Sequence, residues 1–264
     1  MLKFSKKPLM IASGCSFTDP DFSSVFHPEL DTSWDKWPDI FSKKHGFKVL
    51  NVGRSGSGNL RICKSVINAV NKNPNTKLVL VLWSGWDRFS IYGSKWCPIA
   101  MCCKKDEMTQ REELKFLSSR PKTKLMYELS EIILKNYINF GEILDDTMFN
   151  MWLLKDFLEK RNIKYVFAQG VKPIQFSYFD KNYISDVIHP KLKDFLDHQY
   201  HDDLDIENFY GWPLIEQLGG INSETIIDNN PDEWKISNID GHPNAKGQEE
   251  IAKIFSKTYE EIYT

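Results

Sequence analysis

The sequence predicts an α/β fold in which helices cover both faces of a mainly parallel sheet of about five strands. Short apolar runs rich in β-branched and aromatic residues alternate along the chain with segments of helical periodicity. The 264 residues, 41% of them apolar, are enough to bury one large core. Together these observations favour a three-layer αβα arrangement.

Four apolar runs are the candidate strands. Each is continuously apolar and does not alternate with polar residues, which is typical of strands buried on both faces of a parallel sheet. The runs are Pro8–Gly14, Lys48–Val52, Lys77–Trp83 and Lys164–Gln169.

Helical patterns lie between and after these runs. The first places Trp37, Ile40 and Phe41 on one face, and the last follows Pro243-Asn244, which suits the start of a helix. The predicted helices are Trp34–His45, Leu60–Asn71, Lys124–Asn139, Ile143–Arg161 and Ala245–Tyr263.

Two stretches interrupt the alternation, Arg88–Thr123 and Lys172–Pro231. Long connections inside a compact domain are usually functional or disordered, and aromatic residues argue against disorder in the second stretch. We therefore expect one domain over residues 1–264 with an aromatic-rich insertion at about 172–231. The aromatic residues around Asn208–Pro213 favour a partial lid over the strand ends rather than plain core packing.

Composition excludes several classes of function. The 34 basic and 36 acidic residues argue against nucleic-acid binding by bulk positive charge. No apolar run is long enough to span a bilayer, and the one between Lys7 and Ser13 is shorter than the roughly 7–15 residues of a signal peptide. The sequence thus predicts a soluble, cytoplasmic chain without a membrane partner.

Metal and disulfide sites are not expected. The cysteines number five and have no repeating spacing, so reduced thiols are the default. His198 and His201 lie near Asp202 and Asp203, but a solvated polar helix face explains this group better than a metal site. No cofactor is expected.

Polar and glycine-rich sequences follow the first three candidate strands. Because ligands bind beyond the carboxyl ends of parallel strands, these three sequences should converge in space. They are Gly14-Cys15-Ser16-Phe17-Thr18-Asp19, Asn51 to Asn59 with Gly53, Gly56 and Gly58, and Trp83-Ser84-Gly85-Trp86-Asp87-Arg88.

Three residues have the chemistry of a catalytic triad. Ser16 follows the first strand, while Asp240 and His242 lie near the last helix. Acyl transfer requires a nucleophile, a base and an acid that orients the base, and these three residues can fill those roles in that order: Ser16, His242, Asp240. The backbone N–H of Ser16, the glycine-rich second loop and the Asn59 amide can supply donors to an oxyanion.

These motifs resemble the SGNH, or GDSL-like, hydrolases. The matching blocks are Gly14-Cys15-Ser16, Asn51-x-Gly53-x-Ser55-Gly56 and Asp240-Gly241-His242-Pro243-Asn244. The resemblance implies a flavodoxin-like αβα fold and hydrolysis of esters, often acetyl groups on carbohydrates. It assigns Ser16, Asp240 and His242 to the triad, Gly56 to the oxyanion hole, and a small-molecule or glycan ester to the substrate.

The sequence departs from the family pattern at several positions. Cys15 replaces the usual aspartate, and the acid precedes His242 by two residues where three is the commoner spacing. The family's oxyanion asparagine falls at Trp86, beside Asp87, and Asn59 is the candidate substitute. Asn59, Trp86 and Asp87 therefore join Gly56 as candidate oxyanion or substrate-binding residues. Loss of one oxyanion donor costs about 10²–10³ in rate, which leaves a weakened or degenerate enzyme open.

Two other classes of function compete with the esterase. A degenerate glycan-binding or structural protein would keep the fold without a working hydroxyl. A nucleotide-binding protein is suggested by Gly53, Gly56 and Gly58 between a strand and a helix, but the spacing is not that of a dinucleotide or phosphate loop. Presence of Ser16, Asp240 and His242 together favours the enzyme.

Overall fold

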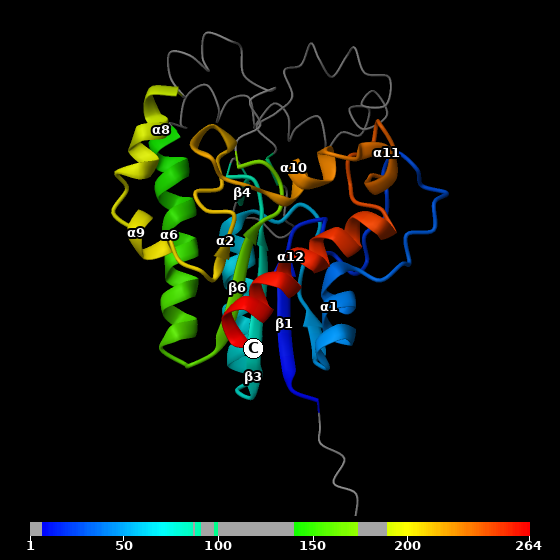
Figure 1. Cartoon of the computed structure of the whole chain (residues 1–264), viewed down its shortest axis with the longest axis horizontal. Coiled ribbons are helices and arrows are strands. Elements are labelled where there is room, and N and C mark those ends of the chain that lie inside the picture. Colours follow the sequence, from blue (N-terminus) through cyan, green and yellow to red (C-terminus); the bar gives the residue numbers. More distant parts are fainter. Residues whose placement is uncertain (1–6, 87, 91–97, 100–139, 174–188) are drawn as a thin grey trace, which may run out of the picture.

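The structure is a computed structural model that describes residues 7–86, 88–90, 98–99, 140–173 and 189–264. Its centre is a five-stranded sheet in the order β2-β1-β3-β6-β7, and all four neighbouring pairs are parallel (Figure 1). The strands are β1 (Leu9–Gly14), β2 (Lys48–Asn51), β3 (Thr76–Trp83), β6 (Lys164–Gln169) and β7 (Phe209–Tyr210). The predicted α/β fold with a flavodoxin-type parallel sheet is confirmed.

Further elements surround this sheet. Two two-residue strands, β4 (Phe89–Ser90) and β5 (Pro98–Ile99), form a separate antiparallel pair. The described helices are α1 (Trp37–His45), α2 (Asn59–Lys72), α6 (Phe140–Glu159), α8 (His189–Leu196), α9 (His201–Leu204), α10 (Ser223–Asp228), α11 (Pro231–Trp234) and α12 (Ala245–Tyr263), with a 3₁₀ turn at Glu216–Leu218.

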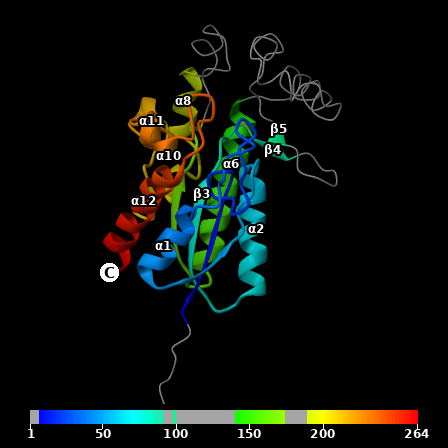
Figure 2. The ribbon, with the colours of Figure 1, turned by 90° about the vertical axis from the view of Figure 1, so that its right-hand side faces the viewer.

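The helices lie on both faces of the sheet. Helices α2 and α6 cover one face, and α1 and α12 cover the other (Figure 2). Alternate strand residues point to opposite faces, so Ile11 and Val79 join the core under α2 and α6. Met10 and Leu80 join the core under α1 and α12. Burial on both faces explains why the strand sequences are continuously apolar.

Helix α1 begins three residues later than the sequence predicts. Lys36 has extended backbone angles (φ −83°, ψ 161°), and Pro38 occupies the first turn. Proline fits there because the first turn has no intrahelical partner for its backbone nitrogen. The segment from Ser33 to Lys36 therefore belongs to the loop before the helix.

The prediction that the aromatic segment at 208–213 forms a lid is wrong. Phe209 and Tyr210 form β7, which pairs with β6 in the register Phe167↔Phe209, and the two phenyl rings lie 5.7 Å apart. Trp212 packs against Phe195 and Phe209 in the core. The backbone pairing makes Phe209 and Tyr210 part of the sheet, opposite Phe167 and Ala168 near the end of β6, and does not place them over the strand ends as a lid. Phe176, Tyr178, Phe179 and Tyr183 lie outside the described residues.

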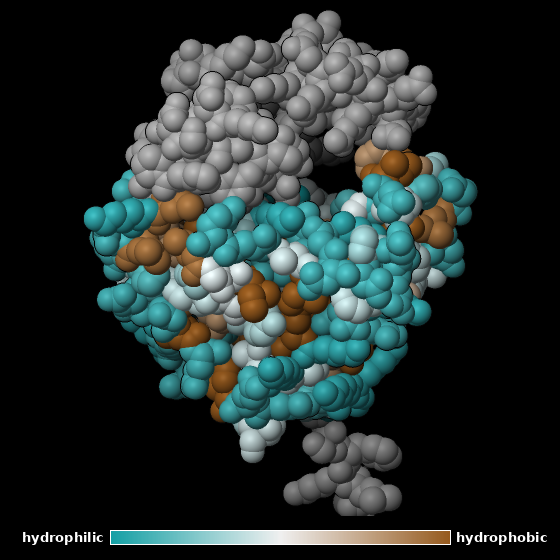
Figure 3. Space-filling view, turned by 45° about the horizontal axis from the view of Figure 1, so that its top comes forward, coloured by the Kyte–Doolittle hydropathy of each residue, from teal (hydrophilic) through white to brown (hydrophobic). Residues whose placement is uncertain are grey.

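Other predictions fall partly or wholly outside the described ranges. The predicted helix Lys124–Asn139 and most of Arg88–Thr123 are among them. Within the described ranges, no helix combines the length and the apolar character needed to cross a bilayer. Figure 3 brings the strand-end side forward and shows a mostly hydrophilic surface with separate apolar patches.

Candidate active site

The loops that follow β1 and β2 lie against each other. The backbone N–H of Arg54 donates to the carbonyl of Gly14 at 3.1 Å. The carboxylate of Asp19 accepts from the backbone N–H of Ser55 at 2.7 Å and from the Arg54 guanidinium at 3.2 Å. Burial alone raises the pKa of Asp19, but the hydrogen bonds from Ser55, Asp21 and Arg54 outweigh it and the pKa is lowered. The ionised carboxylate thus holds the second loop beside the first.

The loop after β3 joins the same cluster through Asn59. The backbone N–H of Ser84 donates to Asn59 Oδ1 at 2.9 Å, and Asn59 Nδ2 donates to the Ser84 carbonyl at 3.3 Å. Gly58 lies directly against this loop, since a Cβ there would be 2.2 Å from the carbonyl oxygen of Arg88. Close packing accounts for this glycine without a phosphate ligand.

Ser16 sits in a tight turn at the end of β1. The backbone N–H groups of Thr18 and Asp19 both donate to the Cys15 carbonyl, at 3.0 and 3.1 Å. Gly14 permits this turn, because a Cβ at that position would lie 2.2 Å from Thr18 Oγ1. The turn fixes Ser16 at the carboxyl end of the sheet, where ligands of open α/β folds bind.

Ser16, His242 and Asp240 form a hydrogen-bonded series. His242 Nε2 lies 2.9 Å from Ser16 Oγ, across 226 residues of sequence. His242 Nδ1 lies 2.5 Å from Asp240 Oδ1, which also accepts from the His242 backbone N–H at 3.1 Å. Each distance is within the reach of a direct hydrogen bond. The arrangement can transfer a proton from the serine hydroxyl to the imidazole while the carboxylate fixes the ring.

The other oxygen of Asp240 is held by Ser24. Ser24 Oγ donates to Asp240 Oδ2 at 2.5 Å and accepts from the backbone N–H of His27 at 2.9 Å. Asp240 is 1% exposed, and this burial alone raises its pKa. The hydrogen bonds from His242 and Ser24 and the nearby imidazole charge outweigh burial and bring the pKa of Asp240 to about 2. The carboxylate therefore stays ionised beside the imidazole.

Two aromatic rings bracket His242. Phe22 lies against the imidazole with ring centroids 4.6 Å apart, and Phe17 presents a nearly perpendicular ring at 5.7 Å. The hydroxyl of Thr32 donates to the Phe22 carbonyl at 2.5 Å and closes the loop that carries Phe22 and Ser24. Sequence reasoning missed Phe22 and Ser24, since neither belongs to a motif.

The candidate oxyanion residues occupy different environments. Gly56 has φ +73°, a left-handed conformation that favours glycine, in the loop next to the Ser16 turn. The Asn59 carboxamide is directed at Ser84, as described above. Trp86 is 3% exposed, stacks on Phe195 at 5.4 Å, and its Nε1 has no partner among the described residues. Asp87 lies outside the described residues. Oxyanion or substrate-binding roles for these four residues stay predictions.

The histidines near residue 200 have other partners. His198 Nε2 lies 3.3 Å from Asp145 Oδ1, and the His201 ring meets Phe195 edge to face at 5.3 Å. Asp202 is exposed, and Trp152 donates to Asp203 at 3.0 Å. In the part of the chain that the structure describes, no three potential metal ligands come together.

The described cysteines are buried free thiols. These are Cys15 and Cys63, and burial raises the pKa of Cys63 to about 12. A thiol that stays protonated is a poor nucleophile, so Cys63 is structural. Cys97, Cys102 and Cys103 lie outside the described residues.

Comparison with known proteins gives distant structural neighbours. No protein-family model matches the chain, and no curated protein matches it in sequence. Solved structures that match along nearly the whole chain include GDSL lipolytic proteins and esterases.

Three of these structures illustrate how low the similarity to this chain is. A protein described as lipolytic, of the G-D-S-L family, from Desulfitobacterium hafniense has 11% identity and a TM-score of 0.48 over 95% of this chain and 99% of its own. The esterase EstA from Pseudoalteromonas sp., inhibited by monoethylphosphonate, has 10% identity and a TM-score of 0.47 over 96% and 97%. A carbohydrate esterase with catalytic and non-catalytic binding functions has 10% identity and a TM-score of 0.40 over 98% and 70%.

Proposed function

We propose that this chain is a serine hydrolase that cleaves short acyl esters, acetyl esters above all, of small molecules or glycans. The observation that carries the proposal is the series Ser16 Oγ to His242 Nε2 at 2.9 Å and His242 Nδ1 to Asp240 Oδ1 at 2.5 Å. A binding or structural protein has no need of an imidazole placed between a hydroxyl and an ionised carboxylate. Acyl transfer requires that arrangement.

The first half of the reaction forms an acyl-enzyme. Ser16 Oγ attacks the ester carbonyl carbon while its proton passes to His242 Nε2, and the carbonyl electrons move to the oxygen. The resulting tetrahedral intermediate collapses, the C–O bond to the alcohol breaks, and His242 returns the proton to the leaving oxygen. Asp240 stabilises the imidazolium and remains ionised, in keeping with its lowered pKa of about 2.

The second half releases the acid. Water gives a proton to His242 Nε2 and attacks the acyl carbon, and the second tetrahedral intermediate breaks its bond to Ser16 Oγ. The serine recovers its proton from His242, and the carboxylic acid departs. A sugar hydroxyl in place of water would give acyl transfer by the same steps.

The oxyanion requires donors close to Ser16. We propose the backbone N–H groups of Ser16 and Gly56, because the hydrogen bonds of Asp19 to Ser55 and of Arg54 to Gly14 hold their loops together. Each such donor contributes about 10²–10³ to the rate. Asn59, Trp86 and Asp87 remain the candidates for a third donor or a substrate contact.

The test is covalent labelling combined with ester turnover. We expect a fluorophosphonate probe to label Ser16 and to leave Ser16→Ala unlabelled. We expect Ser16→Ala and His242→Ala each to lower kcat on 4-nitrophenyl acetate by at least about 10³-fold. Asp240→Asn should retain some activity, with kcat lowered by about 10⁴-fold at most.

Ser13→Ala is the matched control, because Ser13 is a buried serine of β1, the strand that leads into the Ser16 turn, and its hydroxyl bonds to Ser65 at 3.0 Å. This variant should label and turn over like the parent. Absence of labelling in the folded parent, or turnover that survives in Ser16→Ala, would exclude the proposed mechanism.

A further inference from the structure

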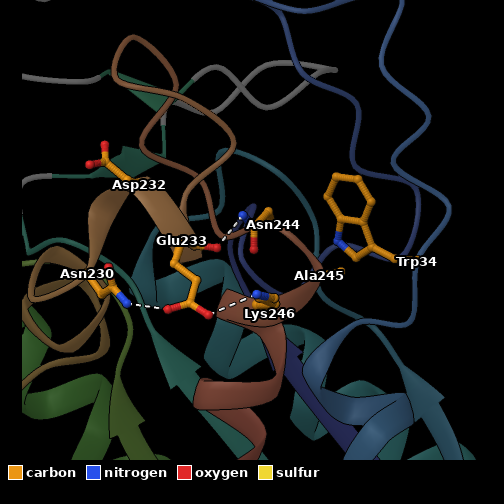
Figure 4. A pocket seen from close by; sticks show the side chains of 7 residues that line it. All are labelled: Trp34, Asn230, Asp232, Glu233, Asn244, Ala245 and Lys246. Atoms are coloured by element: carbon orange, nitrogen blue, oxygen red, sulfur yellow. Dashed lines mark hydrogen bonds and ion pairs between the residues drawn. The ribbon is translucent and has the colours of Figure 1, made fainter.

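A pocket of about 580 Å³ opens beside the loop that carries Asp240 and His242. It lies where the 20–36 segment, α11 and the first residues of α12 meet (Figure 4). Its lining residues are Trp34, Asn230, Asp232, Glu233, Asn244, Ala245 and Lys246. None of them has a role in the proposed triad.

The pocket has an aromatic side and a polar side. In Figure 4 the indole of Trp34 stands across the pocket from Glu233 and Lys246, with Asn244 and Ala245 between them. The carboxylate of Glu233 accepts from Lys246 Nζ at 2.9 Å and from the Asn230 amide. Trp34 thus supplies the aromatic part of the lining, and the Glu233–Lys246 pair supplies donors and acceptors.

The charges of the lining favour a neutral ligand. A cation would meet Lys246, and it would also meet the field of Lys36, whose Nζ lies 4.9 Å from the Trp34 ring. An anion would meet the carboxylates of Asp232 and Glu233. A neutral hydroxyl can donate to Glu233 and accept from Lys246, so it pairs with both members of the ion pair.

The ligand class that combines these properties is a saccharide. The C–H face of a sugar ring packs on an indole, and its hydroxyl groups supply both donors and acceptors at the rim. Ligand sites generally join an apolar wall to a few convergent polar groups in this manner.

The pocket is physically joined to the proposed catalytic residues. Asn244 follows His242 by two residues, which places their Cα atoms within about 7 Å. On the other side, the segment that carries Trp34 also supplies Phe22, against the His242 ring, and Ser24, hydrogen-bonded to Asp240. The pocket lining thus includes Asn244, which belongs to the same loop as His242.

We propose that this pocket is a saccharide subsite that binds one ring of a neutral oligosaccharide by stacking on Trp34. The inference rests on the proposed function in one respect: the ester cleaved at Ser16 is carried by another part of the same glycan. Binding of the sugar itself does not depend on catalysis, so the two proposals fail separately.

Binding is tested with the inactive Ser16→Ala protein by calorimetry or NMR titration. The probes are unacetylated xylohexaose, cellohexaose, mannohexaose and N-acetylated chitohexaose. We expect at least one to bind, and Trp34→Ala in the same background to weaken it at least fivefold while Trp34→Phe retains most of the affinity. Trp152→Ala, which removes a tryptophan from α6, is the matched control and should bind like its parent.

Kinetics supply a second readout. Trp34→Ala should lose at least five times more kcat/KM on acetylated xylo-oligosaccharides than on 4-nitrophenyl acetate. If Trp34→Ala does not fold, Glu233→Gln takes its place, with the same direction expected in both assays. Failure of every oligosaccharide to bind, or binding that is indifferent to Trp34 and Glu233, overturns the subsite. Sugar binding that depends on Trp34 in a protein without esterase activity overturns the proposed function and leaves the subsite standing.

Discussion

At the scale of single residues, the notable feature is that both oxygens of Asp240 are occupied. Oδ1 faces the imidazole of His242, and Oδ2 accepts from the hydroxyl of Ser24. A carboxylate held at both oxygens cannot rotate away from its histidine. Under the proposed function, Ser24 is a positioning residue, since it contacts the imidazole only through Asp240.

The same contacts link stability to pH. The pKa of Asp240 is about 2 in the folded chain against an ordinary value of 3.8, so the unfolded chain binds more protons between these values. The ionised carboxylate therefore contributes stability above about pH 4, and this contribution is lost as the pH falls from about 4 to about 2.

Replacement of Ser24 by alanine should weaken this effect. We expect Ser24→Ala to lower the free energy of unfolding at pH 7 by about 1–3 kcal/mol, because a buried carboxylate loses a donor. The pKa of Asp240 should rise, so the difference from the parent should shrink as the pH falls below about 4. If the proposed function is right, Ser24→Ala should also have a lower kcat with little change in KM. Urea unfolding between pH 7 and pH 2.5 measures the stability effect, and ester kinetics measure the effect on kcat and KM.

Ser24→Thr keeps the hydroxyl and should restore most of both properties. Ser223→Ala is the matched control, since Ser223 is equally buried and its hydroxyl has no partner among the described residues. If Ser24→Ala has the same free energy of unfolding as the parent at every pH, the short contact between Ser24 and Asp240 does not contribute to stability.

At the scale of elements, α12 determines where the His242 loop meets the sheet. Asn244 caps this helix by accepting from the Gly247 backbone N–H at 3.1 Å, and Gln248 Oε1 accepts from the Trp37 backbone N–H at 2.8 Å. The ring of Phe255 stacks on Trp37 at 4.2 Å with planes 10° apart. Helices α1 and α12 are thereby fixed to each other over the β1 end that carries Ser16.

Truncation of this aromatic pair should be costly. Phe255 is fully buried, so Phe255→Ala should lower the free energy of unfolding by about 3–5 kcal/mol through lost burial and a cavity. Phe149→Ala is the matched control, because Phe149 is 41% exposed and should cost no more than about 1 kcal/mol. Chemical denaturation measures both, and equal losses at the two sites would contradict this account of the core.

At the scale of the whole molecule, the parallel sheet has three inner strands and two edge strands. Strands β1, β3 and β6 have neighbours on both sides, whereas β2 and β7 have one each within the described sheet. Central strands usually open only when the whole protein unfolds, and edge elements open locally at lower free energy.

Hydrogen exchange should follow this order. We expect the amides of Met10–Ser13 and Val79–Leu82 to exchange most slowly, at rates that track global unfolding in added denaturant. Those of Phe209 and Tyr210 should exchange sooner and with weaker denaturant dependence. Mass spectrometry on peptides from these segments makes the comparison, and uniform protection across the sheet would contradict it.

The sequence predicted the elements that are determined by patterns within their own residues. Continuous apolar runs located β1, β2, β3 and β6, and the Pro243-Asn244 signature located the start of α12. Strand β7 was missed, because two residues in an aromatic segment carry no period and only pairing with Phe167 makes them a strand. The lid prediction failed for the same reason.

The candidate site divides in a similar way. Ser16, Asp240 and His242 lie in recognisable motifs, and their chemistry as nucleophile, base and acid predicted that they meet. Strand-end reasoning predicted the convergence of the loops that follow the first three strands. Ser24 and Phe22 act through contacts with residues more than 200 positions away, and no local pattern marks them. No local pattern marks Trp34 as a pocket residue either, because the pocket forms only where Trp34 meets residues distant in the sequence.

The separation of 226 positions between Ser16 and His242 also imposes an order in time. A ribosome adds about 5–20 residues each second, so the proposed nucleophile is made on the order of 10–45 s before the proposed base. During that interval the nascent chain holds a serine that nothing activates. If Ser16 is activated only after the last helix has docked, an incomplete nascent chain would not hydrolyse esters near the ribosome. Fluorophosphonate labelling of ribosome-stalled chains of increasing length should start abruptly, once an added C-terminal linker allows α12 to clear the exit tunnel.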